Sequence, residues 1–311
     1  MNTVKKFTLF CAMFMVQSLF HLAQADTKIV LGYTGISDFA AAYVAREEGF
    51  FKKYGLDVEL QLITLTSNIP PSLQSDSIQI GGIAPSVLLQ AAAGGLDLTA
   101  IAGASLSDNS SANPGIVVKS TSAIRTPQDF IGRKIGVPGL GGALHVLMRR
   151  WLTLKGVDYR KVTFIEVPFP QMNDVLKGGS IDAAVVADPF MSRIAQSGVG
   201  TVLVNLSKEL PDGFSVLLYA STREWAKKNQ VALDNFRKAL TEAASFAEKN
   251  LQVTRADIGK YVKVPPSVLA TLPMPRLATD ISSDQLNFWI NAMQQQEMFK
   301  GRPNFFTIVA K

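Results

Sequence analysis

The sequence predicts an α/β protein built from two lobes, and three observations lead to this expectation. Strand-like and helix-like runs alternate along most of the 311 residues, as they do in proteins with a parallel or mixed sheet. A polar, turn-rich stretch at residues 105–114 interrupts the alternation, which then starts again. Without its first 25 residues the chain has about 286 residues, which is more than a single hydrophobic core usually holds.

The elements before this interruption follow from their patterns. Short apolar or alternating runs bounded by turn residues predict strands at residues 28–33, 56–63, 78–81 and 98–104. Apolar residues spaced among polar ones predict helices at residues 38–54, 70–75 and 85–93. Gly55 and Gly94 follow two of these runs, at positions where glycine commonly ends a helix.

The alternation resumes after residue 114. It predicts strands at residues 116–119, 134–137 and 162–167, and three more, at 181–186, 202–205 and 215–219, that complete a second sheet. Helices are predicted between them at residues 127–131, 142–154 and 171–177. The last part is mostly helical, with one apolar face from Phe236 to Ala247 and a capping box at Ser282 and Gln285 before another apolar helix.

The N-terminus has the pattern of a secretory signal peptide over residues 1–25. Lys5 and Lys6 form the positive start, residues 7–22 are apolar, and Ala23-Gln24-Ala25 is a small-x-small cleavage pattern. The alternative is an N-terminal membrane anchor, for which the apolar run is short, since a span needs about 20 residues. We therefore expect export and cleavage after Ala25.

Cleavage would limit the available chemistry. Cys11 and His21 would be lost, which leaves no cysteine and His145 as the one histidine. One mature chain could then form neither a metal site with a cysteine ligand nor one with a pair of histidines. The only histidine available to a Ser-His-Asp triad would be His145. No cofactor is expected. The net charge of +6 falls to +4 without Lys5 and Lys6, and no basic run marks a nucleic-acid partner.

Residues 134–150 have the order strand, glycine turn, helix that proteins often use to bind anions. Gly139 and Gly141 match the start of a dinucleotide fingerprint, but Leu144 stands where its third glycine should be, and no P-loop lysine follows. First-turn amides and the helix dipole can still bind a carboxylate, sulfonate or phosphate. Tight helix–strand packing explains the glycines equally well. His145 is either a packing or hydrogen-bonding residue or a donor beside the anion.

Polar turns also follow other predicted strands: Thr34–Asp38, Ala84–Ser86, Ser105–Ser107 and Asp188–Phe190. Ligands of open α/β sheets bind beyond the carboxyl ends of the strands, so these turns are candidate ligand contacts. Asp38, Ser86 and Asp188 could instead cap helices.

Three stretches carry a resemblance to a known family. Residues 45–59 read AREEGFFKKYGLDVE, residues 129–137 read DFIGRKIGV, and residues 178–183 read GGSIDA, followed by Asp188-Pro-Phe190. The chain therefore resembles periplasmic solute-binding proteins of the nitrate/sulfonate/taurine type, which serve ABC importers. The resemblance implies a type II periplasmic-binding-protein fold: lobe one at 26–112 and 218–311, lobe two at 113–217, and two crossover hinge strands near 109–115 and 214–220.

The resemblance also implies a ligand site made of the turns above. With His145 added, the predicted ligand-binding residues are Thr34, Gly35, Ile36, Ser37, Asp38, Phe39, Ala84, Pro85, Ser86, Ser105, Gly141, Gly142, Ala143, His145, Asp188 and Phe190. The helix after the glycine turn begins Gly142-Ala143, where sulfonate-binding relatives often have Gly-Ser. No arginine in these turns is expected to clamp the ligand. Phe39, Phe169 and Phe190 could flank an organic body, so a small organic anion, a sulfonate or carboxylate that could be aromatic, is favoured over nitrate.

The function that the resemblance implies is that of a periplasmic, monomeric substrate-binding component whose closed form is recognised by an ABC permease in the inner membrane. The alternative is an enzyme on the same fold, related to the pyrimidine-precursor synthases. Those enzymes resemble the chain around Glu48-Gly-Phe-Phe51, but they rely on histidine- and cysteine-rich features and work in the cytoplasm. The expected protein is therefore not an enzyme.

Overall fold

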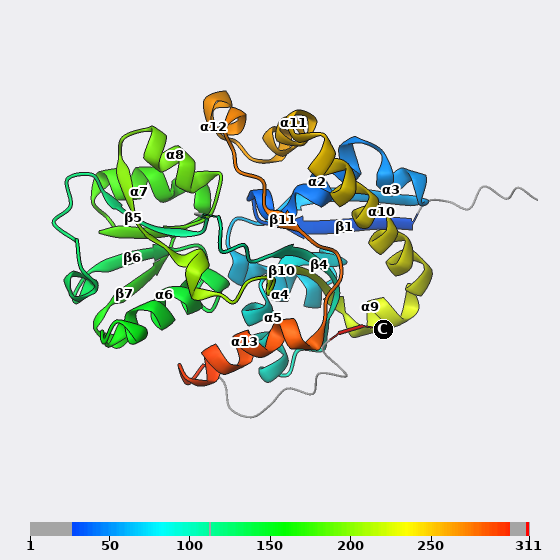
Figure 1. Cartoon of the computed structure of the whole chain (residues 1–311). Coiled ribbons are helices and arrows are strands. Elements are labelled where there is room, and N and C mark those ends of the chain that lie inside the picture. The colour runs from blue at the N-terminus through cyan, green and yellow to red at the C-terminus, as the bar shows by residue number, and fades with distance from the viewer. Residues whose placement is uncertain (1–26, 112, 299–308, 311) are drawn as a thin grey trace, which may run out of the picture.

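The computed structural model describes residues 27–111, 113–298 and 309–310, which form two sheets covered by helices (Figure 1). The first sheet has six strands in the order β11-β4-β10-β3-β1-β2, and the second has five in the order β7-β6-β8-β5-β9. The predicted mixed α/β class with two sheets is confirmed. The predicted signal peptide lies outside the described residues. None of the described helices is both long and apolar enough to cross a membrane.

The first sheet is mixed. Its parallel strands are β1 (Thr27–Tyr33), β2 (Leu56–Leu62) and β3 (Ile80–Ile83). Its antiparallel pairings involve β4 (Leu98–Leu106), β10 (Ser215–Thr222) and β11 (Arg276–Leu277). The helices of this part are α2 (Ala40–Glu47), α3 (Phe50–Lys53), α4 (Ile69–Gln74), α5 (Pro85–Ala93), α9 (Arg223–Lys228), α10 (Gln230–Lys249), α11 (Leu251–Tyr261), α12 (Pro266–Ala270) and α13 (Ser283–Gln294). We call this sheet with its helices lobe one.

The second sheet comes from one continuous part of the chain. Its strands are β5 (Gly115–Lys119), β6 (Lys134–Val137), β7 (Thr163–Glu166), β8 (Ala183–Val186) and β9 (Gly200–Asn205). Its helices are α6 (Ala143–Leu154), α7 (Met172–Gly178) and α8 (Phe190–Gln196), with α6 on one face and α7 and α8 on the other (Figure 1). We call this sheet with its helices lobe two.

Helices cover both faces of the first sheet, so its strands are largely buried. On one face α2, α3, α10 and α11 pack together, and on the other lie α4, α5 and α13 (Figure 1). Aromatic rings fill the first of these layers: Phe51 of α3 stacks on Phe236 of α10 at 5.5 Å between ring centroids, and Tyr219 of β10 meets the same ring edge-on. The apolar face predicted for residues 236–247 is therefore core.

Two predictions about elements are wrong. Residues 215–219 were expected to complete the second sheet, but β10 lies between β3 and β4 of the first. An apolar strand pattern reports burial and is the same whichever sheet the strand joins. The helix expected at 38–54 is interrupted, because Gly49 adopts the left-handed conformation (φ +79°) that separates α2 from α3.

Two chain segments connect the lobes and lie side by side. Residues 107–114 lead from β4 to β5, and residues 206–214, which begin with the short 3-10 helix η6 (Leu206–Glu209), lead from β9 to β10. Ser107 N–H donates to Phe214 O at 2.8 Å, and Gly213 N–H donates to Ser107 O at 3.0 Å. Ser207 Oγ donates to Ser111 O at 2.6 Å. Hydrogen bonds thus join the two connections between the lobes.

Candidate functional site

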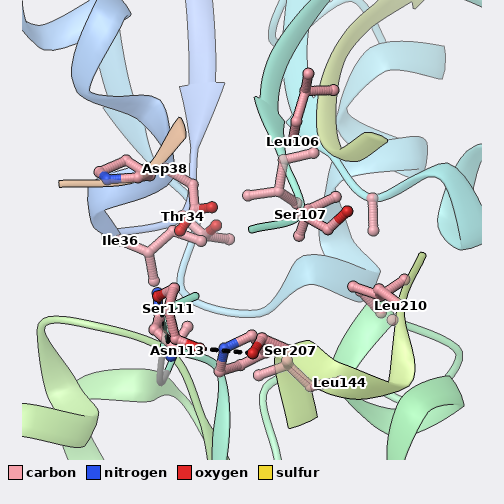
Figure 2. Close-up of a pocket in the computed structure, with 18 of the residues that line it drawn as sticks. Thr34, Ile36, Asp38, Leu106, Ser107, Ser111, Asn113, Leu144, Ser207 and Leu210 are labelled. Carbon is pink, nitrogen blue, oxygen red and sulfur yellow. Dashed lines mark hydrogen bonds between the residues drawn. The ribbon is translucent and has the colours of Figure 1, made fainter. Parts of the chain in front are cut away.

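A cavity lies between the lobes, next to the two connections and at the carboxyl ends of β1, β3, β4, β6 and β8 (Figure 2). Counting the open solvent at its mouth, its empty volume is about 880 Å³. Most of its wall is made by Thr34, Ile36, Asp38, Thr66, Ile83 and Ala84 of lobe one, by Ser107, Asp108, Ser111, Asn113, Pro114, Ser207 and Leu210 of the connections, and by Pro138, Gly142, Ala143, Leu144, Phe169 and Ala187 of lobe two. This is the position that the open-sheet rule predicts for a ligand.

The predicted site residues divide into two groups. Those that line the cavity are Thr34, Ile36, Asp38, Ala84, Gly142 and Ala143. Those that do not line it are Gly35, Ser37, Phe39, Pro85, Ser86, Ser105, Gly141, His145, Asp188 and Phe190. Three of the second group contact lining residues directly: Ser105 donates to Asp38, Phe190 stacks on Phe169, and the Asp188 amide donates to Asn113 Oδ1.

The glycine turn presents the first turn of α6 to the cavity. Gly141 is in the left-handed conformation (φ +80°), and its carbonyl accepts a hydrogen bond from Gln90 Nε2 of lobe one at 3.2 Å. Gly142 is the N-cap residue of α6. In the described part of the chain, no hydrogen bond is donated by the amides of Ala143, Leu144 or His145. These free N–H groups and the helix dipole make the α6 end of the cavity favourable for an anion.

His145 supports this turn from inside lobe two. Its Nδ1 accepts a hydrogen bond from Gly141 N–H at 2.9 Å, and its ring packs edge-on against Phe164 at 4.6 Å. Burial, with a smaller effect of the Arg149 charge, lowers the pKa of His145 to about 3. The imidazole is therefore neutral and carries its proton on Nε2. The sequence left two roles open for His145, and the geometry shows the hydrogen-bonding one, as an acceptor for the Gly141 amide.

Asp38 brings a buried carboxyl group to the lobe-one wall. It lies in the 3-10 helix η1 (Ser37–Phe39), and its Oδ1 accepts a hydrogen bond from Ser105 Oγ at 2.8 Å. Burial, reinforced by the charge of Asp188, raises the pKa of Asp38 to about 6. No ion pair to Asp38 exists among the described residues. Ser105 thus contributes to the site through Asp38 and not as a lining residue.

Several contacts join the lobes beside the cavity. Ser37 donates from both its N–H and its Oγ to Asp188 O, each at 3.2 Å. On another side Thr66 N–H donates to Pro138 O at 3.3 Å. The Asp188 side chain, one residue before the N-cap Pro189, accepts at Oδ1 from Ser192 N and Oγ in the first turn of α8. Ser86 Oγ is buried and has no partner in the part of the chain that the structure describes.

The aromatic residues proposed to flank a ligand have different positions. Phe169 lines the cavity. Phe190 stacks behind it, with ring centroids 5.7 Å apart. Phe39 packs under β3, where a side chain at Gly82 would collide with its ring, and against Tyr219. One aromatic ring of the three is therefore available to an organic ligand.

Some lining residues could not be identified in the predicted turns. Asp108, Ser111 and Asn113 belong to the stretch interpreted as a lobe boundary, whose small polar residues soon after a strand were the available signal. Ser107, which also lines the cavity, lies in the predicted turn Ser105–Ser107. Arg276 also lines the cavity, to which β11 brings it, and it lies outside the turns in which no clamping arginine was expected. Its guanidinium is half exposed and pairs with Asp212 at 3.2 Å.

Comparison with known proteins assigns the chain to a family. The family model described as "NMT1/THI5 like" matches residues 36–252. The chain belongs to this family. A putative binding protein of Brucella abortus (strain 2308) is 25% identical over 258 residues, covering 80% of this chain and 78% of the relative. A nitrate/nitrite-binding protein of Nostoc sp. is 25% identical over 249 residues, covering 72% of this chain and 54% of the relative.

Solved structures agree on the fold of this NMT1/THI5-like protein. The alkanesulfonate-binding protein of Xanthomonas axonopodis pv. citri, solved with MOPS bound, superimposes with a TM-score of 0.80 at 20% identity, covering 91% of this chain and 98% of the other. The periplasmic nitrate-binding protein of Synechocystis PCC 6803 gives 0.77 at 18% identity, covering 88% and 82%. The predicted family and the predicted periplasmic-binding-protein fold are both confirmed.

Proposed function

We propose that this protein is the exported substrate-binding component of an ABC importer and that it captures a small organic acid between its two lobes. The observation that carries the proposal is the row of amides at the start of α6 that donate no hydrogen bond within the described residues and face a cavity lined by both lobes. Two proteins with similar sequences or folds are described as nitrate/nitrite-binding and alkanesulfonate-binding.

The acid group is placed at the N-terminal end of α6. A 12-residue helix carries partial positive charge at this end, and its first N–H groups can bind a carboxylate or sulfonate without a basic side chain. Gly142 supports this placement, since a residue without a side chain lets a ligand approach the amides closely. The apolar part of the ligand would lie against Phe169, Leu144 and Ile36, which also line the cavity.

Capture requires a change in the position of the lobes. A ligand that contacts both lobes is bound more tightly when they are closed, so it shifts the population toward the closed form by the difference in affinity. The contacts between Ser37 and Asp188 and between Thr66 and Pro138 belong to that closed form. The predicted partner is an inner-membrane permease that recognises the closed lobes.

Export and lobe boundaries are part of the same proposal. Residues 1–25 act as the signal peptide, and the mature monomer is periplasmic. Lobe one comprises residues 26–112 and 218–311 and lobe two residues 113–217, except that β10 assigns residues 215–217 to lobe one. N-terminal sequencing of the protein from a periplasmic extract checks this: a mature chain that begins at Asp26 supports it, and a full-length chain in the membrane fraction contradicts it.

Thermal unfolding tests the ligand class. Purified mature protein is screened with carboxylates, sulfonates and nitrate, while native mass spectrometry identifies any molecule that co-purifies. A ligand at about 100 times its Kd stabilises the native state by about 2.7 kcal/mol, so Tm should rise by roughly 5–10 °C with organic acids and less with nitrate. A screen without any shift contradicts the proposal. Turnover of the bound acid on long incubation would instead support the enzyme alternative.

A further inference from the structure

We propose that the ligand carries an N–H donor, either an ammonium or a heterocyclic N–H, at the end opposite its acid group, and that Asp38 is the residue that binds this donor. This inference rests on the proposed function and narrows its substrate class from organic acids to amphoteric molecules. It follows from the charges on the cavity wall, the partners of Asp38 and the position of Asp38 relative to α6.

Three charged side chains line the cavity: Asp38, Asp108 and Arg276. Two of them are already compensated. Arg276 is half exposed and pairs with Asp212. Asp108 accepts hydrogen bonds from Ser110 N at 2.8 Å and Ser110 Oγ at 2.6 Å within its own turn. Asp38 differs from both, since it is only 8% exposed and has no basic partner among the described residues.

The groups around Asp38 do not supply the missing positive charge. Ser105 Oγ donates to Oδ1, and no hydrogen bond to Oδ2 occurs in the described part of the chain. From lobe two, the charge that acts on Asp38 is that of another carboxyl group, Asp188, which is also buried and whose Oδ2 has no partner among the described residues. The remaining titratable neighbours are the phenols of Tyr43, which donates to Ile36 O, and Tyr219. A buried carboxylate in such surroundings requires a donor, and the cavity is where one can enter.

The two ends of the cavity are therefore complementary to two different groups. Figure 2 shows Asp38 on the lobe-one side and Leu144, in the first turn of α6, on the lobe-two side. The α6 amides favour an anion, whereas Asp38 favours a cation or an N–H donor. A plain organic acid leaves Asp38 buried and unpaired, so the site discriminates against it.

Matched ligand pairs test this inference. The pairs are 3-aminopropanoate with butanoate, 2-aminoethanesulfonate with propane-1-sulfonate, and imidazole-4-acetate with phenylacetate, measured by calorimetry at pH 7.5. At least one nitrogen-bearing member should bind ten or more times more tightly than its partner. Asp38→Asn should reduce this ratio to nearly one. Asp57→Asn is the control, because it changes an exposed carboxyl group of β2 that does not line the cavity, and it should leave the ratio unchanged.

The pH dependence gives a second readout. Binding of an ammonium ligand needs ionised Asp38, so its affinity should increase as the pH rises from 5 to 7.5, and the increase should be absent in Asp38→Asn. Circular dichroism and Tm confirm that the variant is folded. Equal binding of both members of every pair, or an unchanged ratio in Asp38→Asn, overturns the inference but leaves the proposed function standing. If none of these acids and no acid of the wider screen binds, the proposed function falls and this inference falls with it.

Discussion

At the residue scale, burial gives His145 and Asp38 opposite dependences of stability on pH. The pKa of His145 is lowered from 6.5 to about 3, so the unfolded chain takes up the proton first as the pH falls. Its contribution to stability is complete above pH 6.5 and is lost as the pH falls toward 3. The pKa of Asp38 is raised from 3.8 to about 6, so its contribution is complete below pH 3.8 and is lost as the pH rises through 6.

The first prediction concerns His145→Leu. The substitution leaves the buried N–H of Gly141 without an acceptor, so the free energy of unfolding at pH 7 should fall by about 1–3 kcal/mol. Because the titrating group is gone, this loss should shrink as the pH is lowered from 6.5 to 4. Urea unfolding at a series of pH values measures both effects. His145→Gln, which keeps an acceptor, should lose less at pH 7. A loss that is the same at every pH would contradict the assignment.

At the element scale, the glycine turn between β6 and α6 is fitted against the other lobe. A side chain at Gly139 would place its Cβ 2.0 Å from Thr66 Oγ1 and 3.4 Å from Ser67 N. Thr66 belongs to the short 3-10 helix η2 (Thr66–Asn68) of lobe one. Position 139 therefore needs a glycine because the two lobes meet there. The partial match to a nucleotide-binding fingerprint gave no indication of this contact.

The second prediction follows from this contact. Gly139→Ala should disfavour the closed arrangement by about 1–3 kcal/mol, which weakens ligand affinity by a factor of roughly 5 to 150. Lobe two itself should remain stable, because the collision is with lobe one. Thr66→Ala in the same chain should restore part of the affinity. Calorimetry with the acid that gives the largest rise in Tm in the thermal-unfolding screen measures these changes.

Gly178→Ala is the control for Gly139→Ala. Apart from its own helix and chain neighbours, no described atom lies within 4 Å of the Cβ that it adds, so affinity should not change. If Gly139→Ala binds as tightly as the wild type, the lobes do not close as this structure has them.

Most elements could be predicted, because periodicity and turn residues act over a few neighbouring positions. The helix expected at 85–93 and the strand expected at 134–137 are confirmed with the same bounds. The capping box at Ser282 and Gln285 is present at the start of α13. The break at Gly49 was not predicted, since a glycine inside a helical pattern is also compatible with a continuous helix.

At the scale of the whole molecule, α13 connects the lobes on the side where it packs against both α5 and α6. Gln296, just beyond the end of α13, is buried and donates from Nε2 to Val146 O of α6 at 3.0 Å. Its carbonyl accepts from Arg149 Nη2 at 2.9 Å and from Tyr159 OH at 3.2 Å. This contact holds the two lobes in the arrangement seen here.

The third prediction is that Gln296→Ala favours the open form. Loss of the side-chain hydrogen bond should cost about 1 kcal/mol in the closed form, so affinity should fall roughly fivefold. Small-angle X-ray scattering of the ligand-free protein should give a larger radius of gyration. Asn291→Ala, on the exposed side of α13, is the control and should change neither quantity. Lower stability without any change in affinity would show that this contact is kept when the lobes open.

The sequence by itself determined the α/β class, the two-lobed alternation, the glycine turn before a helix and the family, because each of these depends on residues close together in the chain. The tertiary structure alone decided which turns meet. Asp38 and Ser105 are 67 positions apart, and Ser37 and Asp188 are 151 apart. It also decided that β10 joins the first sheet and that Arg276 reaches the cavity. Such contacts result from the packing of distant elements, and local periodicity contains no information about that packing.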